Sequence, residues 1–317
     1  MRKNEGGKEM LEVCLLGCCG MMPLPERWLT SLLLRCNGHS LLIDCGEGTQ
    51  IALREQRLGF KDIDTICFTH YHADHISGLP GLMLTIGNCE RTEPLLLVGP
   101  RGLERTVRRF LTVAPELPFP LEFLELEEGV QSFRRGELGI TAFPVEHSMP
   151  CRGYTLELPR AGRFDPDRAR EAGIPVPFWG RLQKGEIITE NGQTYTPDQV
   201  LGPPRRGLKL VYATDSRPVQ EIARQAAGAD LLVCEGMYGE PEKAQKAAEK
   251  RHMTFQEAAA LAAQAQPERL WLTHFSPALT EPEAYLPLAR EIFPATELGE
   301  DGKRITLRFR DEKGNRA

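Results

Sequence analysis

Three histidines and an aspartate fall within six consecutive positions of FTHYHADHISG, residues 68–78. The run DTICFTH is short, apolar and rich in β-branched residues, so it predicts a buried strand that ends at His70. Side chains two apart in an extended chain point the same way, so we expect His70 and His72 to face one side. Asp74 and His75 follow where the chain is expected to turn. One loop therefore offers two pairs of metal-ligating groups.

Three further predicted strands end on the same kinds of residue. GITAFPVEH ends at His147, LKLVYATD ends at Asp215, and RLWLTH ends at His274. The carboxyl ends of several strands can converge on one rim of a layered fold. A single histidine at a strand end is usually a hydrogen-bonded rim residue, but this whole set predicts a dinuclear metal site.

The ligand types indicate which ions would bind and what they would do. Neutral imidazoles and carboxylates suit Zn²⁺, with Mn²⁺ or Fe²⁺ as alternatives. Six terminal ligands and one bridging carboxylate can hold two ions about 3.5–4 Å apart. Such a pair lowers the pKa of a water between the ions, which makes hydroxide available at neutral pH. We therefore expect a hydrolase that binds two Zn²⁺ per chain.

Composition limits the class of protein. The chain has 317 residues, of which 41% are hydrophobic and 26% charged, enough for a large globular core. No apolar run approaches about 20 residues, so no membrane span is expected. Residues 1–9 are polar and lack the apolar region of a secretory signal, and we expect a cytoplasmic protein. The net charge of −5 excludes a basic footprint over the whole surface.

The nine cysteines are an odd number, and several lie inside apolar runs. This pattern is typical of reduced, buried thiols rather than of a disulfide framework. Cys14, Cys18 and Cys19 could alternatively form a soft metal site, but no second cluster stands nearby to complete four ligands.

Short strand-like runs and amphipathic helical stretches share the chain. Helices are expected at 102–113, 217–227, 254–265 and 283–292, and the third opens with a capping box of Thr254 and Glu257. Strands come in runs, with helices between only some of them. This order favours a layered α/β sandwich with mixed sheets over a strictly alternating fold.

Residues 159–207 interrupt that order with seven prolines and seven glycines. A short helix is predicted at 165–173, and Asn191-Gly192 predicts the turn of a small hairpin. Residues 160–209 carry a net charge of +3, whereas the rest of the chain carries −8. We interpret the segment as an insertion that projects from the main body.

These motifs resemble the metallo-β-lactamase superfamily and, within it, the ribonuclease Z family. HYHADH with the downstream His, Asp and His resembles the superfamily's metal motifs, and LLIDCGEGTQ resembles the family's second motif. The resemblance implies a four-layer αββα sandwich, of two mixed sheets flanked by helices, over residues 10–310. It also implies cleavage of precursor tRNA at its 3′ end.

The resemblance also implies roles for the ligands. His70, His72 and His147 would bind one metal ion, and Asp74, His75 and His274 the other, with Asp215 as the bridge. Asp44 in IDCGEG would orient a ligand histidine, although it could instead be a turn residue that closes a strand.

Two further residues are expected to act in catalysis together with Asp74. Glu235 ends the predicted strand DLLVCEG, and His252 lies just before the helix cap at Thr254. By resemblance, His252 would donate a proton to a leaving 3′ oxygen and Glu235 would favour its protonated form. His252 could instead be a surface histidine near a helix start.

Proteins of this family often have a protruding arm that binds tRNA away from the active site. Residues 159–207 lie at the corresponding position, between His147 and Asp215. Candidate substrate contacts are Arg27, Arg163, Arg181 and Lys184. The sequence departs from the family pattern at four places, which leave the metal motifs intact. These are Trp28 after Arg27, Val176-Pro177 in the arm, RHMT around His252, and Asp215-Ser216.

Several functions are compatible with these residues. The first is a homodimeric phosphodiesterase that removes 3′ trailers from precursor tRNA. The second is a small-molecule hydrolase that acts on cyclic nucleotides, phosphorylated metabolites or sulfate esters. A thioesterase like glyoxalase II would leave Glu235 and His252 without a role. A binding subunit with an inactive site conflicts with the complete ligand set.

Overall fold

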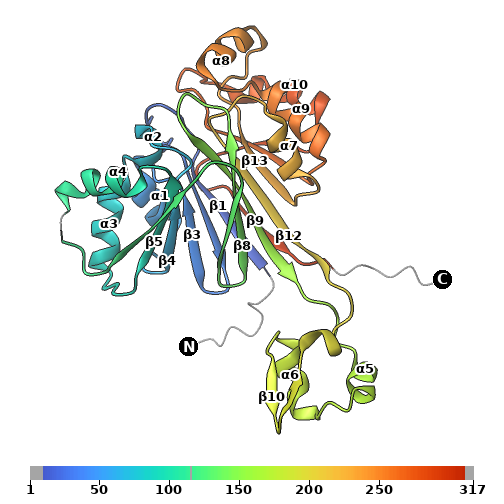
Figure 1. Ribbon diagram of the computed structural model, residues 1–317. Helices are drawn as coiled ribbons and strands as arrows, with labels where there is room; N and C mark the ends of the chain where they lie inside the picture. Colours follow the sequence, from blue (N-terminus) through green and yellow to red (C-terminus); the bar gives the residue numbers. More distant parts are fainter. Residues whose placement is uncertain (1–9, 115, 311–317) are drawn as a thin grey trace.

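Two seven-stranded sheets face each other, and helices cover the outer face of each (Figure 1). The computed structural model describes residues 10–114 and 116–310, so residues 1–9, for which a polar extension was predicted, lie outside the described part. Both sheets mix parallel and antiparallel pairs. The predicted αββα sandwich is confirmed.

The first sheet has the order β16-β1-β2-β3-β4-β5-β6, and helices α1–α4 pack on its outer face (Figure 1). Its strands are β16 (Arg304–Arg308), β1 (Met10–Gly17), β2 (Ser31–Cys36), β3 (His39–Ile43), β4 (Ile63–Cys67), β5 (Leu95–Pro100) and β6 (Leu121–Leu126). Its helices are α1 (Thr49–Glu55), α2 (Ala73–Ile76), α3 (Leu79–Asn88) and α4 (Leu103–Phe110).

The second sheet has the order β15-β14-β13-β12-β9-β8-β7, and α7, α9 and α10 lie on its outer side (Figure 1). Its strands are β15 (Thr296–Leu298), β14 (Leu270–Thr273), β13 (Leu231–Glu235), β12 (Arg205–Ala213), β9 (Cys151–Arg160), β8 (Leu138–Val145) and β7 (Gln131–Arg135). The helices are α7 (Gln220–Ala226), α8 (Ala244–Lys250), α9 (Phe255–Ala265) and α10 (Leu286–Ile292).

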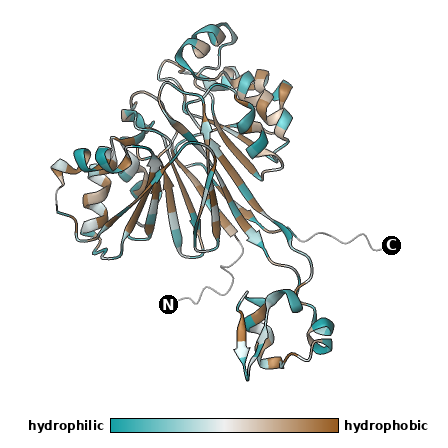
Figure 2. Ribbon diagram, viewed as in Figure 1, coloured by the Kyte–Doolittle hydropathy of each residue, from teal (hydrophilic) through white to brown (hydrophobic). Residues whose placement is uncertain are grey.

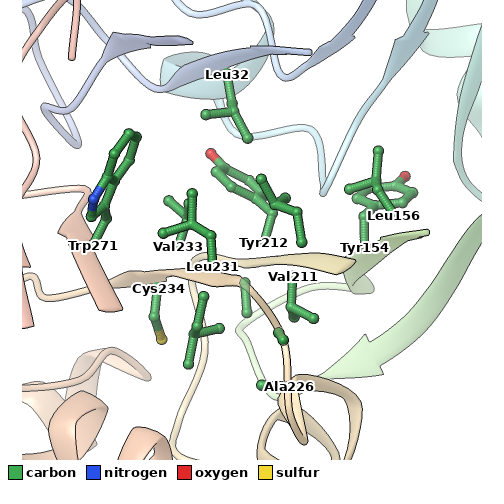
Figure 3. Close-up of a cluster of buried hydrophobic side chains, with 14 of the residues drawn as sticks. Leu32, Tyr154, Leu156, Val211, Tyr212, Ala226, Leu231, Val233, Cys234 and Trp271 are labelled. Carbon is green, nitrogen blue, oxygen red and sulfur yellow. The ribbon is translucent and has the colours of Figure 1, made fainter. Parts of the chain in front are cut away.

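The core between the sheets follows from the alternation of side chains along each strand. Tyr212 on β12 and Trp271 on β14 point toward Leu32 of the first sheet, whereas Val211 points to the helix side near Ala226 (Figure 3). All five side chains are buried. Figure 2 shows that apolar residues run through both sheets, while the outer helices carry both hydrophobic and hydrophilic residues. Both sheet faces are thus covered, as a four-layer fold requires.

The predicted helix at 254–265 is confirmed together with its capping box. Thr254 Oγ1 accepts a hydrogen bond from Glu257 N, and Glu257 Oε2 accepts one from Thr254 N. The predicted strand ends were wrong by one to three residues for four strands: β4 ends at Cys67, β8 at Val145, β12 at Ala213 and β14 at Thr273. The metal-ligating residues therefore lie just after the strands, with Asp74 and His75 in α2.

The segment between β9 and β12 has a small core of its own and projects from the end of the sandwich (Figure 1). It contains α5 (Pro166–Glu171), α6 (Val176–Gln183), β10 (Ile188–Glu190) and β11 (Gln193–Tyr195). Asn191 and Gly192 both have positive φ at the hairpin turn, as their sequence predicted. Helix α6 was not predicted, because Pro177 and Gly180 are poor helix formers within its short apolar pattern. We call residues 161–204 the inserted segment.

Within the described residues, no helix combines the length and the apolar character that crossing a membrane would require.

Two glycines allow the loop that carries Asp74 and His75 to approach the loop after β3. A Cβ on Gly46 would lie 2.4 Å from Asp74 O, and one on Gly78 would lie 2.2 Å from Gly46 O. Gly78 N also donates to Cys45 O. This close backbone contact sets the position of α2 relative to the first sheet.

We predict that Gly46→Ala lowers the free energy of unfolding by about 1–3 kcal/mol, because the added methyl group has no space. It should also lower the amount of metal bound per chain, because α2 would shift. Gly180→Ala is the matched control, since a Cβ there would meet nothing within 4 Å. Urea unfolding and metal analysis of both variants check this, and equal behaviour of the two would contradict it.

Candidate metal centre

Five segments meet at one end of the sandwich, and each contributes at least one residue that the sequence predicted to belong to the metal site. Asp44 follows β3, residues 68–75 follow β4 and run into α2, His147 follows β8, Asp215 follows β12 and His274 follows β14. Asp44, Asp215 and His274 have φ of 60°, 52° and 58°. Residues with a Cβ rarely adopt this left-handed conformation, and such positions are concentrated at functional sites. Here the conformation turns each chain sharply as it leaves its strand.

Four side chains form the first cluster: His70, His72, His147 and Asp215. His72 Nδ1 lies 2.9 Å from His70 Nε2 and 3.2 Å from His147 Nε2. Asp215 Oδ2 lies 3.7 Å from His70 Nε2 and 3.6 Å from His147 Nε2. Burial lowers the pKa of His70 and of His147, which favours the neutral imidazole that a metal ion needs.

Asp74, His75 and His274 form the second cluster, again beside Asp215. His75 Nε2 lies 3.2 Å from His274 Nε2, and Asp74 Oδ2 lies 3.4 Å from His274 Nε2. The other oxygen of the shared carboxylate, Asp215 Oδ1, lies 3.2 Å from His75 Nε2 and 3.1 Å from His274 Nε2. Each oxygen of Asp215 therefore faces a different cluster.

These distances fit a pair of divalent ions. Nitrogen ligands about 2.0–2.1 Å from a tetrahedral ion lie roughly 3.3 Å from one another, close to the separations in both clusters. Asp215 Oδ1 is buried, and its near neighbours are the ring nitrogens of His75 and His274 at 3.2 and 3.1 Å. A buried carboxylate oxygen that faces imidazole nitrogens is suited to a bound cation, which would accept lone pairs from all three groups. The two clusters are typical of a binuclear site.

Asp44 is fully buried behind the second cluster. Its oxygens accept hydrogen bonds from Thr69 N at 2.8 Å and from Thr69 Oγ1 at 2.9 Å. Asp44 Oδ2 also lies 2.8 Å from His75 Nδ1, which must donate to a carboxylate. This bond fixes the ring so that His75 Nε2 faces the cluster. Asp44 is placed where it would orient a ligand histidine, the role that the resemblance implies for it.

His252 and Glu235 lie together beside the clusters. Glu235 is fully buried, and its carboxylate lies 3.2–3.3 Å from His252 Nδ1. The ring of His252 stacks near His274, with centroids 5.6 Å apart. Burial acts to lower the pKa of His252, but Glu235, together with Asp215 and Asp74, raises that pKa to about 8. This shift favours the protonated ring that a proton donor needs.

Arg217 is a further residue of this site that the sequence analysis missed. Its guanidinium donates to His252 O and forms an ion pair with Glu257, the capping residue of α9. Glu235 accepts hydrogen bonds from Ser216 N and Met253 N as well. The loop that holds the shared aspartate and the loop that holds His252 are thus tied together. Arg217 lies two residues after Asp215, and this closeness to a predicted ligand is the sequence feature that could have indicated its role.

A cavity of about 800 Å³ opens above the clusters. It is lined on one side by Met21, His72 and Asp74, and on the other by α8 and His252. Arg27 does not line it, since its Nη1 donates to Leu279 O instead. The volume of the cavity is within the usual range for ligand sites. It can therefore hold a phosphodiester together with a group attached to it.

The remaining predicted substrate contacts lie in the inserted segment, away from the cavity. Arg163 and Lys184 are exposed, and Arg181 pairs with Glu186 at 2.7 Å. Strand β9 begins next to the first cluster, where Cys151 Sγ lies 3.7 Å from His70 Nδ1. Its ten residues then run to the segment, a distance of roughly 30 Å.

The cysteines are free among the described residues, and none of them belongs to a group there that could hold a metal ion. Cys14 belongs to the core between the first sheet and its helices, whereas Cys18 belongs to the core between the sheets. Because these side chains point to opposite faces, Cys14, Cys18 and Cys19 do not form the soft metal site that the sequence left open.

Two family models match parts of the chain. One, described as "Anti-Pycsar protein Apyc1", matches residues 11–112, and the other, described as "Beta-lactamase superfamily domain", matches residues 199–275. The fold is similar to that of YhfI, a metallo-β-lactamase fold protein of Bacillus subtilis, with a TM-score of 0.69 over 95% of this chain and 100% of that one, at 19% identity. Fold and clusters together define a metal-dependent hydrolase of the metallo-β-lactamase superfamily.

Relatives of full length identify the family. Ribonuclease Z of Lachnoclostridium phytofermentans is 56% identical over 95% of this chain and 99% of its own length. Ribonuclease Z of Agathobacter rectalis is 54% identical over 96% and 100%. The short form of human tRNase Z has a TM-score of 0.66 at 26% identity, over 93% of this chain and 98% of that one. The chain belongs to the ribonuclease Z family.

We predict that Asp215→Ala removes both bound ions, because both clusters lose a ligand. His72→Ala should remove mainly the ion of the first cluster. His39→Ala is the control, because His39 pairs with Asp64 on the surface and belongs to neither cluster. Elemental analysis of the purified variants checks this, and an Asp215→Ala protein that keeps both ions would contradict the shared role.

Proposed function

We propose that this protein is an endonuclease that removes 3′ trailers from precursor tRNA in the cytoplasm. The observation that carries the proposal is the Glu235–His252 pair beside two clusters that share one carboxylate. The high identity to ribonuclease Z proteins along nearly the whole chain supports it. We further propose that the ions are Zn²⁺, with Mn²⁺ or Fe²⁺ as alternatives, and that the protein is a homodimer.

The metal ligands in this proposal are those of the two clusters, listed by ion. The first ion would be held by His70, His72 and His147 and the second by Asp74, His75 and His274, with Asp215 able to serve both. When bound, two divalent ions would polarise the scissile phosphate and neutralise the charge that develops on it. Asp44 would keep the ring of His75 in its ligating orientation.

His252 is proposed to act on the leaving group. Hydrolysis adds water across the P–O3′ bond, so the leaving 3′ oxygen of the tRNA must gain a proton. His252 borders the cavity, and the carboxylate of Glu235 favours its charged form by raising its pKa. Donation of the proton from Nε2 would leave a neutral ring that Glu235 still holds at Nδ1. Arg217 would fix the backbone of His252 while this happens.

We predict that His252→Ala slows cleavage of precursor tRNA by about 10²–10⁴-fold, because general acid assistance is lost. The amount of bound metal should not change. A nitrophenolate leaving group needs no proton, so the loss should be much smaller with a nitrophenyl phosphodiester. Turnover of both substrates by the variant and by His39→Ala checks this, and equal losses on the two substrates would exclude the general acid role.

The inserted segment is proposed to bind tRNA away from the metal centre. Its distance from the clusters and its exposed Arg163 and Lys184 support this. Phosphate contacts position a nucleic acid and make its affinity fall with salt. A small diester could reach the cavity without touching the segment.

We predict that removal of residues 164–201 weakens binding of precursor tRNA and flattens its dependence on salt. Arg163 O accepts a hydrogen bond from Gly202 N at 2.8 Å, so a short glycine turn can join the ends. Hydrolysis of a small diester should survive, because the two clusters are untouched. Filter binding at several salt concentrations and diester turnover measure the two effects.

If the unchanged protein shows no salt-dependent binding of tRNA, the proposed substrate is wrong. The inserted segment would then be structural, and a small phosphodiester would become the better substrate. Light scattering of the purified protein tests the homodimer separately, since neither substrate requires it.

A further inference from the structure

Helix α8 forms one wall of the cavity above the metal clusters. It lies at the end of the sandwich opposite the inserted segment (Figure 1). Lys246, Glu249, Lys250 and Arg251 from this helix and its end line the cavity. Apart from the clusters and His252, they are its charged lining residues within the described part of the chain, and together they are positive.

The helix is held firmly in this position. Ala247 is fully buried against Met237 and Tyr238. Arg251 ends the helix in a left-handed conformation and donates to His147 O at 2.7 Å. His252 N donates back to Ala247 O at 2.8 Å. The helix and the histidine that follows it therefore form one unit with the metal centre.

Two cations of this helix lack an ionic partner. Lys246 and Lys250 are exposed, and neither pairs with a carboxylate in residues 10–114 or 116–310. They are four residues apart, so they lie on the same side of the helix. Lys243, one turn earlier, differs because it pairs with Glu240 and does not line the cavity. Lysines that border a phosphodiester site without a carboxylate partner are suited to bind neighbouring phosphates.

The position of His252 determines which part of the substrate lies next to Lys246 and Lys250. The leaving 3′ oxygen belongs to the tRNA and not to the trailer, so the end of the tRNA must lie on the side of His252. Helix α8 leads directly into His252 and so borders that side. The trailer would leave on the other side of the scissile phosphate.

We propose that Lys246 and Lys250 bind phosphates of the tRNA strand just before the cleavage site, and not those of the trailer. This inference rests on the proposed function and on the role of His252 within it. It assigns α8 to product recognition, so the mature tRNA with its free 3′ hydroxyl should bind at α8.

The test compares the double variant Lys246→Gln, Lys250→Gln with Lys243→Gln. Inhibition of precursor cleavage is measured with two probes: mature tRNA, and a trailer oligonucleotide with a 5′ phosphate. In the double variant, the inhibition constant of mature tRNA should rise roughly tenfold, and its log–log salt slope should flatten by about 1.5. The constant for the trailer should not rise, and Lys243→Gln should match the unchanged protein.

Three results would overturn the inference. An unchanged constant for mature tRNA would show that α8 does not touch it. A selective loss of trailer inhibition would place the trailer on this side. If the unchanged protein does not cleave precursor tRNA at all, the proposed function fails and this inference fails with it, whereas either of the first two results leaves the proposed function intact.

Discussion

The carboxylate of Asp215 lies between two histidine clusters, and each of its oxygens faces one of them. The arrangement needs five loops from two sheets to meet within a few ångströms. It also needs Asp215 and His274 to leave their strands with positive φ, which residues with a Cβ rarely adopt. Converging ring nitrogens around a buried carboxylate are poor packing for a core, but they suit cations. The rigid four-layer sandwich holds this arrangement in place.

Strands β9 and β12 connect the metal centre to the inserted segment. Cys151 at the start of β9 touches His70, and the far end of the strand leads into the segment. Cleavage at the metal centre and binding of the substrate by the inserted segment can therefore take place at opposite ends of one pair of strands. A long, folded nucleic acid could meet both ends, whereas a small diester would meet only the cavity. The same division is consistent with a departure from the family pattern at Val176-Pro177, in the segment, that leaves the metal residues intact.

Much of the site could be predicted because its residues are local in sequence or follow recognisable strands. His70, His72, Asp74 and His75 come from one loop, and the other ligands follow apolar runs. The strand ends were misplaced because residue spacing alone does not reveal where the pairing between neighbouring strands stops. Helix α6 was not predicted, because Pro177 and Gly180 are poor helix formers. Arg217 was missed because its partners, His252 and Glu257, are distant in sequence and meet it only in the folded chain.

The central claim is that two ions sit between histidine and aspartate ligands and share Asp215. X-ray absorption spectroscopy of the protein loaded with zinc tests it most directly. The account predicts a first shell of nitrogen and oxygen at about 2.0–2.2 Å. It also predicts a second metal at about 3.5–4 Å. Sulfur at about 2.3 Å would instead place zinc on the cysteines, and a spectrum without a neighbouring metal would contradict the shared carboxylate.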